Sequence, residues 1–383
     1  TIFEPHITNL EALRKIRANT SCLLSVVGSI MTPEEAESLL EEGSADLIML
    51  GRSTLADPFW PVKAQMGHSE DIVPCIRCLQ CYHVSTDHKN VQCSVNPRFN
   101  REKRVPLILP VTGHPKHLVI VGGGPAGITC ALTASRRGHQ VTLLEKEPVL
   151  TGKLNIACHG EHKADLRRFR DYLLTQLRKS SVTVHTGVLA DTDVVRDLKP
   201  DALVIAVGAT PSRIPLPGVD GDNCIQISEF LQSPDTSLQH YIIIGGGSVG
   251  CETALDLAEK GKDVSIIEMA DCLASASNDL YRLALSEHFA RYDNLHTYLN
   301  SACQSIDADG VNVLTNGAST HISGDKVLLS LGFRPDAKQV SSLYGIVPDT
   351  YYVGDCERVA TVAEAVNNAY FIGANVFQEQ DII

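Results

Sequence analysis

The sequence predicts an α/β protein, and three observations carry this prediction. A short apolar run, a glycine-rich turn and a helix follow one another twice, with the first glycines at Gly122 and Gly245, 123 residues apart. Two further strand and helix pairs precede them in residues 1–74. The composition is 44% hydrophobic but only 5% aromatic, with 28 glycines, which is typical of parallel sheets covered by helices.

Charge and hydropathy exclude several other classes of protein. A net charge of −12 argues against a general nucleic-acid-binding surface or an anionic-membrane surface. No apolar run reaches about 18 residues, so we expect no membrane partner. Twelve cysteines in a chain without an export signal indicate a reducing compartment, and we expect a cytoplasmic protein.

Residues 1–74 have the pattern of two successive units of a parallel barrel. A helix over 9–19 precedes an apolar strand over 22–27. Thr32-Pro33-Glu34-Glu35 then predicts a helix that begins with a capping box, and a second apolar strand covers 46–50. Strand and helix in alternation form the repeating unit of a TIM (β/α)8 barrel.

A phosphate site is expected where these two strands end. The loops after the last two strands of a (β/α)8 barrel commonly hold a phosphate. Gly28, Ser29 and Gly51 would offer backbone amides to it, and Arg52 would pair with it. A glycine turn beside a solvated arginine is the alternative on this segment alone.

Four cysteines predict a metal-sulfur centre. Cys75, Cys78 and Cys81 follow a C-x2-C-x2-C spacing, and Cys93 returns after a gap of eleven residues. A tight turn with three thiols and a fourth thiol from a short loop suits a [4Fe–4S] cluster. Zinc is the alternative, although structural zinc sites usually show two separated cysteine pairs. A disulfide framework fits a long chain without a secretory signal less well.

After a linker with three prolines, the first glycine-rich turn predicts a dinucleotide site. The apolar run 117–121 leads into Gly122-Gly123-Gly124-Pro125-Ala126-Gly127, and a helix and a second strand ending at Glu145 follow. Gly122 would allow the tight turn, Gly124 a close approach to a pyrophosphate, and Gly127 the packing of helix on strand. Ala126 lies within the turn, and Glu145 would accept a hydrogen bond from a ribose hydroxyl.

The second glycine-rich turn repeats this arrangement with the same internal spacing. Gly245, Gly247 and Gly250 occupy the three glycine positions, and Glu268 follows the first of them by 23 residues, as Glu145 follows Gly122. We therefore expect two bound nucleotides. Glu268 and the nearby Asp271 favour NADH, because a 2′-phosphate would face negative charge there.

Two flanking motifs indicate which nucleotide each glycine-rich fold would bind. Val207-Gly208-Ala209-Thr210 and Tyr351-Tyr352-Val353-Gly354-Asp355 resemble the flavin-domain motifs of disulfide-reductase-like proteins with two dinucleotide folds. The second motif follows the second fold, so the resemblance implies that the second fold is inserted into the first. The outer fold would then hold FAD, with Gly208, Asp355 and Lys153 beside it, and the inserted fold the nicotinamide. ADP in the outer site remains the alternative.

The whole pattern resembles one family of flavoenzymes. Gly28-Ser29, Gly51-Arg52, the four cysteines and Asn96-Pro97 are similar to the end of the barrel in the iron-sulfur flavoenzymes related to old yellow enzyme. These include 2,4-dienoyl-CoA reductase, 2-enoate reductase, bile-acid dienoate reductases and trimethylamine dehydrogenase. The x2 gap before Cys81 is similar to the amine dehydrogenase pattern. The resemblance implies FMN at the barrel phosphate site and six further barrel strands. These strands would carry the catalytic residues, on a longer chain or on a second polypeptide or subunit.

The resemblance implies an NADH-dependent oxidoreductase. Electrons would pass from NADH to FAD, to the [4Fe–4S] cluster and to FMN, for reduction of the activated C=C bond of a small unsaturated substrate. The alternatives are an amine dehydrogenase that runs electrons outward and an electron-transfer module for a separate catalytic protein. The expected domains are a partial barrel (1–74), a cluster segment (75–105), an FAD domain (106–235 and 336–383) and an NAD domain (236–335).

Overall fold

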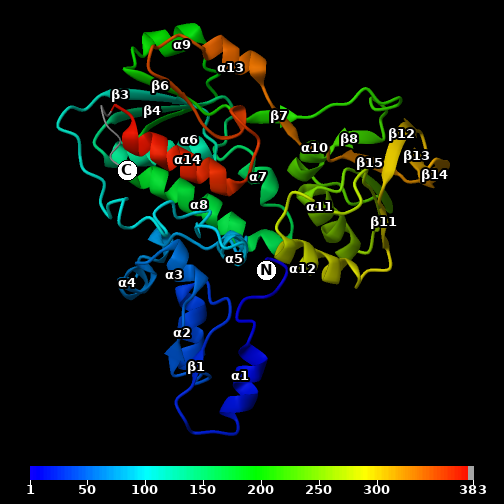
Figure 1. Cartoon of the computed structure of the whole chain (residues 1–383), viewed down its shortest axis with the longest axis horizontal. Coiled ribbons are helices and arrows are strands. Elements are labelled where there is room, and N and C mark those ends of the chain that lie inside the picture. Colours follow the sequence, from blue (N-terminus) through cyan, green and yellow to red (C-terminus); the bar gives the residue numbers. More distant parts are fainter. Residues whose placement is uncertain (378–383) are drawn as a thin grey trace. The chain divides into compact units, whose positions relative to one another are not determined.

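The computed structural model describes residues 1–377, which form two compact units. Among the described residues, the outer unit comprises 2–154, 164–208 and 336–377, and the inserted unit comprises residue 1, 155–163 and 209–335. Figure 1 labels their elements. Within the described residues, no helix is long and apolar enough to cross a membrane.

The outer unit begins with two strand and helix pairs. Its first elements are α1 (Leu10–Arg17), β1 (Ser25–Val26), α2 (Pro33–Glu41) and β2 (Leu47–Ile48). The strands pair in parallel, and Thr32 and Glu35 form the expected capping box at the start of α2. Both strands are shorter than the expected 22–27 and 46–50. Within the described residues each pairs only with the other, so little of either run is held in a ladder.

Short helices connect this part to the nucleotide fold. They are α3 (Arg52–Ala56), α4 (Trp60–Gln65), η1 (Ser69–Asp71) and α5 (Gln80–Thr86). Asn96 donates a hydrogen bond of 2.8 Å from Nδ2 to the carbonyl of Leu55, which fixes the returning loop against α3. Residues 87–116 contain no helix or strand, and this stretch includes the linker expected over 98–116.

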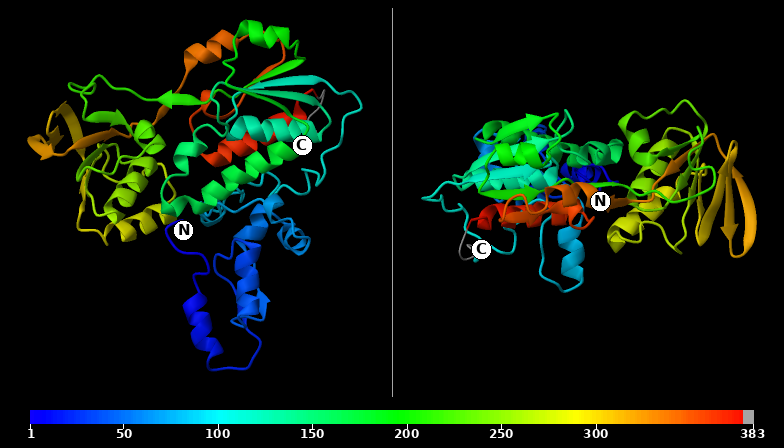
Figure 2. Two further views of the ribbon diagram at one scale, coloured as in Figure 1. Left: turned by 180° about the vertical axis from the view of Figure 1, so that it is seen from behind. Right: turned by 90° about the horizontal axis from the view of Figure 1, so that it is seen from above.

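The outer nucleotide fold is a parallel sheet between two layers of helices. Its strands, in spatial order, are β17 (Thr350–Tyr352), β6 (Ala202–Ile205), β3 (His117–Val121), β4 (Gln140–Glu145) and β5 (Thr183–Thr186). One face is covered by the long helices α6 (Pro125–Arg136), α8 (Ala164–Lys179) and α14 (Val362–Asn375) (Figures 1 and 2). The other face carries the short helices α9 (Thr192–Asp197) and α13 (Ala337–Leu343). The alternating apolar side chains of β3 therefore pack into two cores.

The inserted unit repeats this sheet and adds antiparallel strands. Its parallel strands, in spatial order, are β11 (Leu295–Tyr298), β10 (Asp263–Ile267), β9 (His240–Ile244), β15 (Lys326–Leu329) and β8 (Cys224–Gln226). The antiparallel strands are β12 (Ser301–Asp307), β13 (Gly310–Thr315) and β14 (Ala318–Ser323), with the separate pair β7 (Ala209–Pro211) and β16 (Phe333–Pro335). The helices are α10 (Ile227–Gln232), α11 (Ser248–Glu259) and α12 (Asp279–Phe289).

The nested order expected from the motifs is found, but the boundaries differ: residues 155–163 also belong to the inserted unit, and the expected segments 1–74 and 75–105 are not separate from the outer fold. β17, which follows the inserted unit in sequence, returns to pair with β6 of the outer sheet. The outer domain was expected to continue to residue 235, whereas 209–235 belongs to the inserted unit. The cause is strand pairing, because β8 lies in parallel beside β15 with Cys224 opposite Val327.

Three short helices complete the elements of the described residues. They are α7 (Leu154–Ala157) and η2 (Glu161–Lys163), which precede α8, and η3 (Gly354–Cys356), which follows β17.

Candidate functional site

Each glycine of the outer turn has a different steric environment, which explains why glycine occupies that position. Gly122 has φ +112°, and a Cβ there would lie 2.2 Å from the carbonyl oxygen of Ala206. A Cβ on Gly127 would lie 1.9 Å from the Gly122 oxygen, so only glycine lets α6 pack this closely on β3. A Cβ on Gly124 would meet nothing within 4 Å. This open side, at the start of a twelve-residue helix, suits a pyrophosphate.

Glu145 is oriented by the turn itself. Its Oε2 accepts a hydrogen bond of 2.6 Å from the Gly123 amide, and its Oε1 accepts one of 2.9 Å from the Glu147 amide. The side chain is held at the carboxyl end of β4 beside the turn, and each oxygen retains a lone pair for another donor. This geometry can receive a ribose hydroxyl.

The other expected outer-site residues converge on the same edge of the sheet. The Thr151 amide donates a hydrogen bond of 2.7 Å to the Gly123 carbonyl, which holds the turn before α7 against the glycine loop. Lys153 Nζ lies 2.5 Å from Asp355 Oδ2, so the two candidate residues form an ion pair. Gly208, with φ +74°, follows β6 at the same edge.

The inserted turn repeats the geometry of the outer one. Gly245 has φ +107°, and a Cβ on it would lie 2.3 Å from the carbonyl oxygen of Ser330. A Cβ on Gly250 would lie 2.2 Å from the Gly245 oxygen, whereas one on Gly247 would meet nothing within 4 Å. Glu268 accepts hydrogen bonds from the amides of Gly246 (2.6 Å) and Ala270 (2.8 Å). The inserted unit therefore offers a second pyrophosphate and ribose site.

The barrel phosphate residues lie together after β1 and β2. Arg52 Nη2 donates a hydrogen bond of 2.8 Å to Ser29 Oγ, and Ser29 follows Gly28, which has φ +139°. Arg52 Nη1 is buried and has no hydrogen-bond partner among the described residues. A buried guanidinium N–H without a partner is costly unless an anion binds it, and a Cβ on Gly51 would meet nothing within 4 Å. These residues fit a phosphate group.

The four predicted cysteine ligands gather beneath the outer nucleotide fold. Cys75, Cys78 and Cys93 pack against the core that also contains α6 and α14, and the thiols lie near enough for their charges to interact. Burial raises the pKa of Cys75 to about 12, that of Cys93 to about 11, and also that of Cys81. Thiols with raised pKa values are poor nucleophiles, so the group does not suit a reactive dithiol.

Several residues that the sequence analysis did not single out hold these cysteines. Arg77 donates from its backbone amide to Cys75 Sγ (3.4 Å), and its Nε lies 2.5 Å from Asp165 of α8. Ser94 Oγ lies 3.1 Å from Cys78 Sγ. Asn367 of α14 donates a hydrogen bond of 3.1 Å to the Cys93 carbonyl. Arg77 and Ser94 could have been suspected from their place beside the cysteines, whereas Asp165 and Asn367 gave no such signal.

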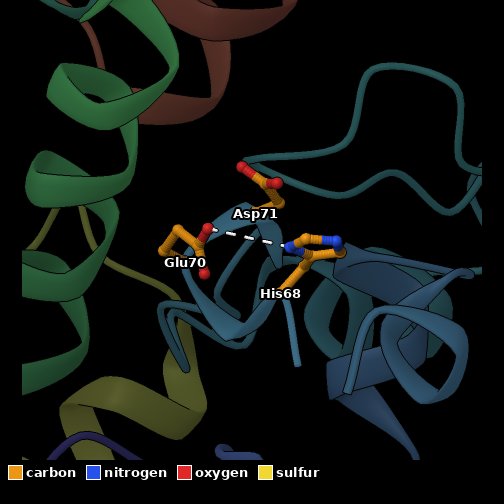
Figure 3. A group of neighbouring side chains, drawn as sticks. All are labelled: His68, Glu70 and Asp71. Atoms are coloured by element: carbon orange, nitrogen blue, oxygen red, sulfur yellow. Dashed lines mark ion pairs between the residues drawn. The ribbon is translucent and has the colours of Figure 1, made fainter. Parts of the chain in front are cut away.

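A separate group of metal-ligating side chain types lies on η1. Figure 3 shows His68, Glu70 and Asp71, with His68 Nδ1 4.0 Å from Glu70 Oε1. Lys179 Nζ lies 2.8 Å from Glu70 Oε1 and 2.7 Å from Asp71 Oδ1. The lysine ammonium already supplies positive charge to both carboxylates, so this group is explained as an ion-pair network that fixes η1 to α8.

Two family models match the chain. The pyridine nucleotide-disulphide oxidoreductase model matches residues 116–369, which span both nucleotide folds. The NADH:flavin oxidoreductase / NADH oxidase family model matches residues 2–71, the part that contains β1 and β2.

Curated relatives match almost the whole chain. An NADH oxidase of Thermoanaerobacter brockii is 34% identical over 90% of this chain and 54% of its own length. A bilirubin reductase of Mediterraneibacter gnavus is 32% identical over 97% of this chain and 58% of its own length. The chain thus spans about half the length of the curated relatives it matches.

A solved structure shares the same architecture. The 2-naphthoyl-CoA reductase in complex with 2-naphthoyl-CoA superposes with a TM-score of 0.92 at 27% identity, over 98% of this chain and 57% of that chain. The resemblance seen in the glycine turns and in the first two strand and helix pairs therefore agrees with both family models. The chain belongs to the pyridine nucleotide-disulphide oxidoreductase family, and its residues 2–71 are similar to the NADH:flavin oxidoreductase / NADH oxidase family.

Proposed function

We propose that this chain carries NADH oxidation and electron transfer in an enzyme that reduces an activated C=C bond. The observation that carries the proposal is the place of the four cysteines in the outer unit. Asn367, on the last helix of the flavin-type fold, donates a hydrogen bond to the Cys93 carbonyl. Burial raises the pKa of Cys75 and of Cys81, and the positive charge of Arg52 in the barrel phosphate site partly opposes this rise, so Arg52 lies close to both thiols. A centre held there adjoins both sites.

The spacing of the cysteines along the chain favours a [4Fe–4S] cluster over zinc. Cys75, Cys78 and Cys81 follow a C-x2-C-x2-C pattern with Cys93 as a fourth thiol, which suits a [4Fe–4S] cluster. Structural zinc sites usually show two separated cysteine pairs instead.

The residues at the three nucleotide and phosphate sites fit FAD, NADH and FMN. The outer site combines the open side of Gly124 with Glu145 and the Lys153–Asp355 pair. At the inserted site Glu268 places a carboxylate where NADPH would carry its 2′-phosphate. When bound, these cofactors would supply hydride transfer from NADH to FAD and single-electron transfer through the cluster to FMN. The chain's own residues bind and orient them.

The proposed substrate class follows from the names of the relatives. Those relatives include a bilirubin reductase and a cinnamate reductase of Clostridium sporogenes, and the solved structure is a 2-naphthoyl-CoA reductase. Reduction of an unsaturated acid, thioester or ketone is therefore proposed for the complete enzyme, in which this chain supplies the reducing electrons. An amine dehydrogenase is less favoured, because the nicotinamide-type turn is intact in every glycine position.

A second candidate, an electron-transfer module for another polypeptide, has its own supporting observation. β1 and β2 pair only with each other among the described strands, and apolar side chains around them are exposed, including Leu47 (57%) and Met49 (55%). This surface suits coverage by further barrel strands. Those strands would come from the same longer protein or from a partner.

The test is anaerobic purification followed by reduction with NADH. We expect FAD, about four irons and matching acid-labile sulfide per chain. NADH should bleach the flavin and reduce a dye. Zinc without iron would contradict the cluster, and a flavin that NADH does not bleach would contradict the direction of electron flow. Enoate reduction that requires an added polypeptide would favour the module, whereas efficient reduction by the 383 residues alone would show that the active site is misplaced.

A further inference from the structure

Backbone amides approach the sulfur atoms of Cys75, Cys81 and Cys93, whereas Cys78 Sγ lies within hydrogen-bond distance of a side-chain hydroxyl. The Arg77 backbone amide lies 3.4 Å from Cys75 Sγ, and the Ser94 hydroxyl lies 3.1 Å from Cys78 Sγ. Ser94 is only 4% exposed. Water therefore competes little for its hydroxyl, and the low local dielectric strengthens the bond.

Metal binding decides which atom donates between Ser94 and Cys78. A thiol and a hydroxyl could each donate to the other. A cysteine that ligates a metal is a thiolate and has no proton left to donate. The Ser94 hydroxyl is then the donor, and the sulfur carries the negative charge that the bond stabilises.

The second donor is held in place by a buried ion pair. Arg77 has φ +47°, a left-handed conformation that costs a non-glycine residue roughly 1 kcal/mol. Its side chain is 5% exposed, with Nε 2.5 Å from Asp165 Oδ2 and Nη1 2.6 Å from the Glu4 carbonyl. These contacts offset the backbone strain and keep the amide directed at Cys75. Asp165 acts through Arg77 and is therefore a positioning residue.

We propose that the Ser94 hydroxyl sets the reduction potential of the metal-sulfur centre, with the Arg77 amide as a second, fixed donor. This inference rests on the proposed function, because it requires the cysteines to bind a [4Fe–4S] cluster. With a cluster bound, uptake of one electron would add negative charge that is shared by the cysteine sulfurs. A donor to those sulfurs stabilises the reduced state more than the oxidised state, and so raises the potential.

The test removes the hydroxyl in two ways. Ser94→Ala deletes the hydroxyl of the native serine. Ser94→Thr and Ser94→Val have side chains of nearly the same shape, and only the Thr variant keeps a hydroxyl where the Val variant has a methyl group. The potential of the one-electron couple is measured on anaerobic protein by redox potentiometry followed by EPR, with iron and sulfide determined in parallel. Ser301→Ala is the matched control, since Ser301 is buried but bonds to Leu299 and Thr315 in the inserted unit.

We expect Ser94→Ala to retain native iron content with a more negative potential. Ser94→Val should be lower in potential than Ser94→Thr, and Ser301→Ala should match the native protein. An unchanged potential in Ser94→Ala, or equal potentials for the Thr and Val variants, would overturn the inference while leaving the cluster intact. Loss of iron from both variants without the hydroxyl would also overturn it, because Ser94 would then retain the ligand rather than tune it. Native protein without iron would instead overturn the proposed function.

Discussion

The two nucleotide folds share a local design but differ in what surrounds it. In both, the first glycine of the motif has positive φ, and the third leaves room for the carbonyl of the first. In both, a glutamate accepts a hydrogen bond from the amide of the residue that follows the first glycine. Beside the outer turn lie the Lys153–Asp355 pair and a core shared with the cysteine loop. In the inserted unit, three antiparallel strands pack against the parallel sheet instead.

This difference shows that the glycine turn encodes a dinucleotide site but does not by itself choose the dinucleotide. The turn supplies amides, an open side and an acid, which any adenosine pyrophosphate can use. The assignment of flavin to one copy and nicotinamide to the other rests on side chains that come from distant segments. Four predictions test this separation, from the largest expected effect to the smallest.

The largest effect should come from the third glycine of each turn. Gly127→Ala would place a Cβ 1.9 Å from the Gly122 oxygen, and Gly250→Ala would place one 2.2 Å from the Gly245 oxygen. We expect Gly127→Ala to weaken flavin binding at least about a hundredfold. We expect Gly250→Ala to abolish reduction of the flavin by NADH while the flavin remains bound. Flavin content and NADH bleaching measure the two effects.

A matched control exists for this pair. A Cβ on Gly113 would meet nothing within 4 Å, and this glycine has no positive φ, so Gly113→Ala should leave both measurements unchanged. If each of the two turn variants lost both the bound flavin and the reaction with NADH, the outer and inserted folds would not bind their nucleotides independently.

The second effect concerns the cysteines, which accompany only the outer copy. Cys93→Ser replaces one thiolate ligand, and we expect iron to fall from about four per chain to near zero. FAD should remain, and NADH should still bleach it, because neither glycine turn is altered. Flavin loss in parallel with iron would contradict a separate cofactor site for the cysteines.

The third effect separates the two glutamates. We expect a ten- to hundredfold preference for NADH over NADPH, about 1.4 to 2.8 kcal/mol, and its reduction in Glu268→Ala. Glu145→Ala is the matched variant, which should weaken flavin binding without changing the ratio. The measurement is the flavin reduction rate with each cofactor. Equal native rates would remove Glu268 from the nicotinamide site.

The smallest effect is a pH dependence confined to the outer unit. Hydrogen bonds with Asp165 and Glu35 raise the pKa of His6 to about 9. Burial would raise the pKa of both carboxyls, but their hydrogen bonds lower it, so they stay ionised above neutral pH. Since the folded-state pKa of His6 is raised, its contribution is complete below about pH 6.5 and is lost as pH rises through about 9.

We expect His6→Gln to lower the free energy of unfolding by about 1 kcal/mol at pH 6 and by almost nothing at pH 10. The figure at pH 6 is kept small because solvent screens the partly exposed His6. Trp60, the only tryptophan in the sequence, lies buried in the outer unit, so its fluorescence during denaturant unfolding reports this unit. An equal loss of stability at both pH values would show that His6 contributes packing rather than charge.

The sequence by itself determined the elements whose chemistry is local. The glycine turns and the capping box at Thr32 follow from steric limits and hydrogen bonds within a few residues, and the structure has them where they were predicted. The two strands before residue 51 were predicted too long. The spacing of the cysteines likewise predicted a shared centre without any tertiary information.

Only the tertiary structure decided how these local parts are held together. The boundary near residue 209 depends on β8 finding β15 as a partner about a hundred residues later. The supports of the cysteine loop, Asp165 and Asn367, lie 88 and 274 residues from Arg77 and Cys93. No sequence pattern links such pairs, because they meet only when helices packed on one face of the outer sheet bring them beside the loop.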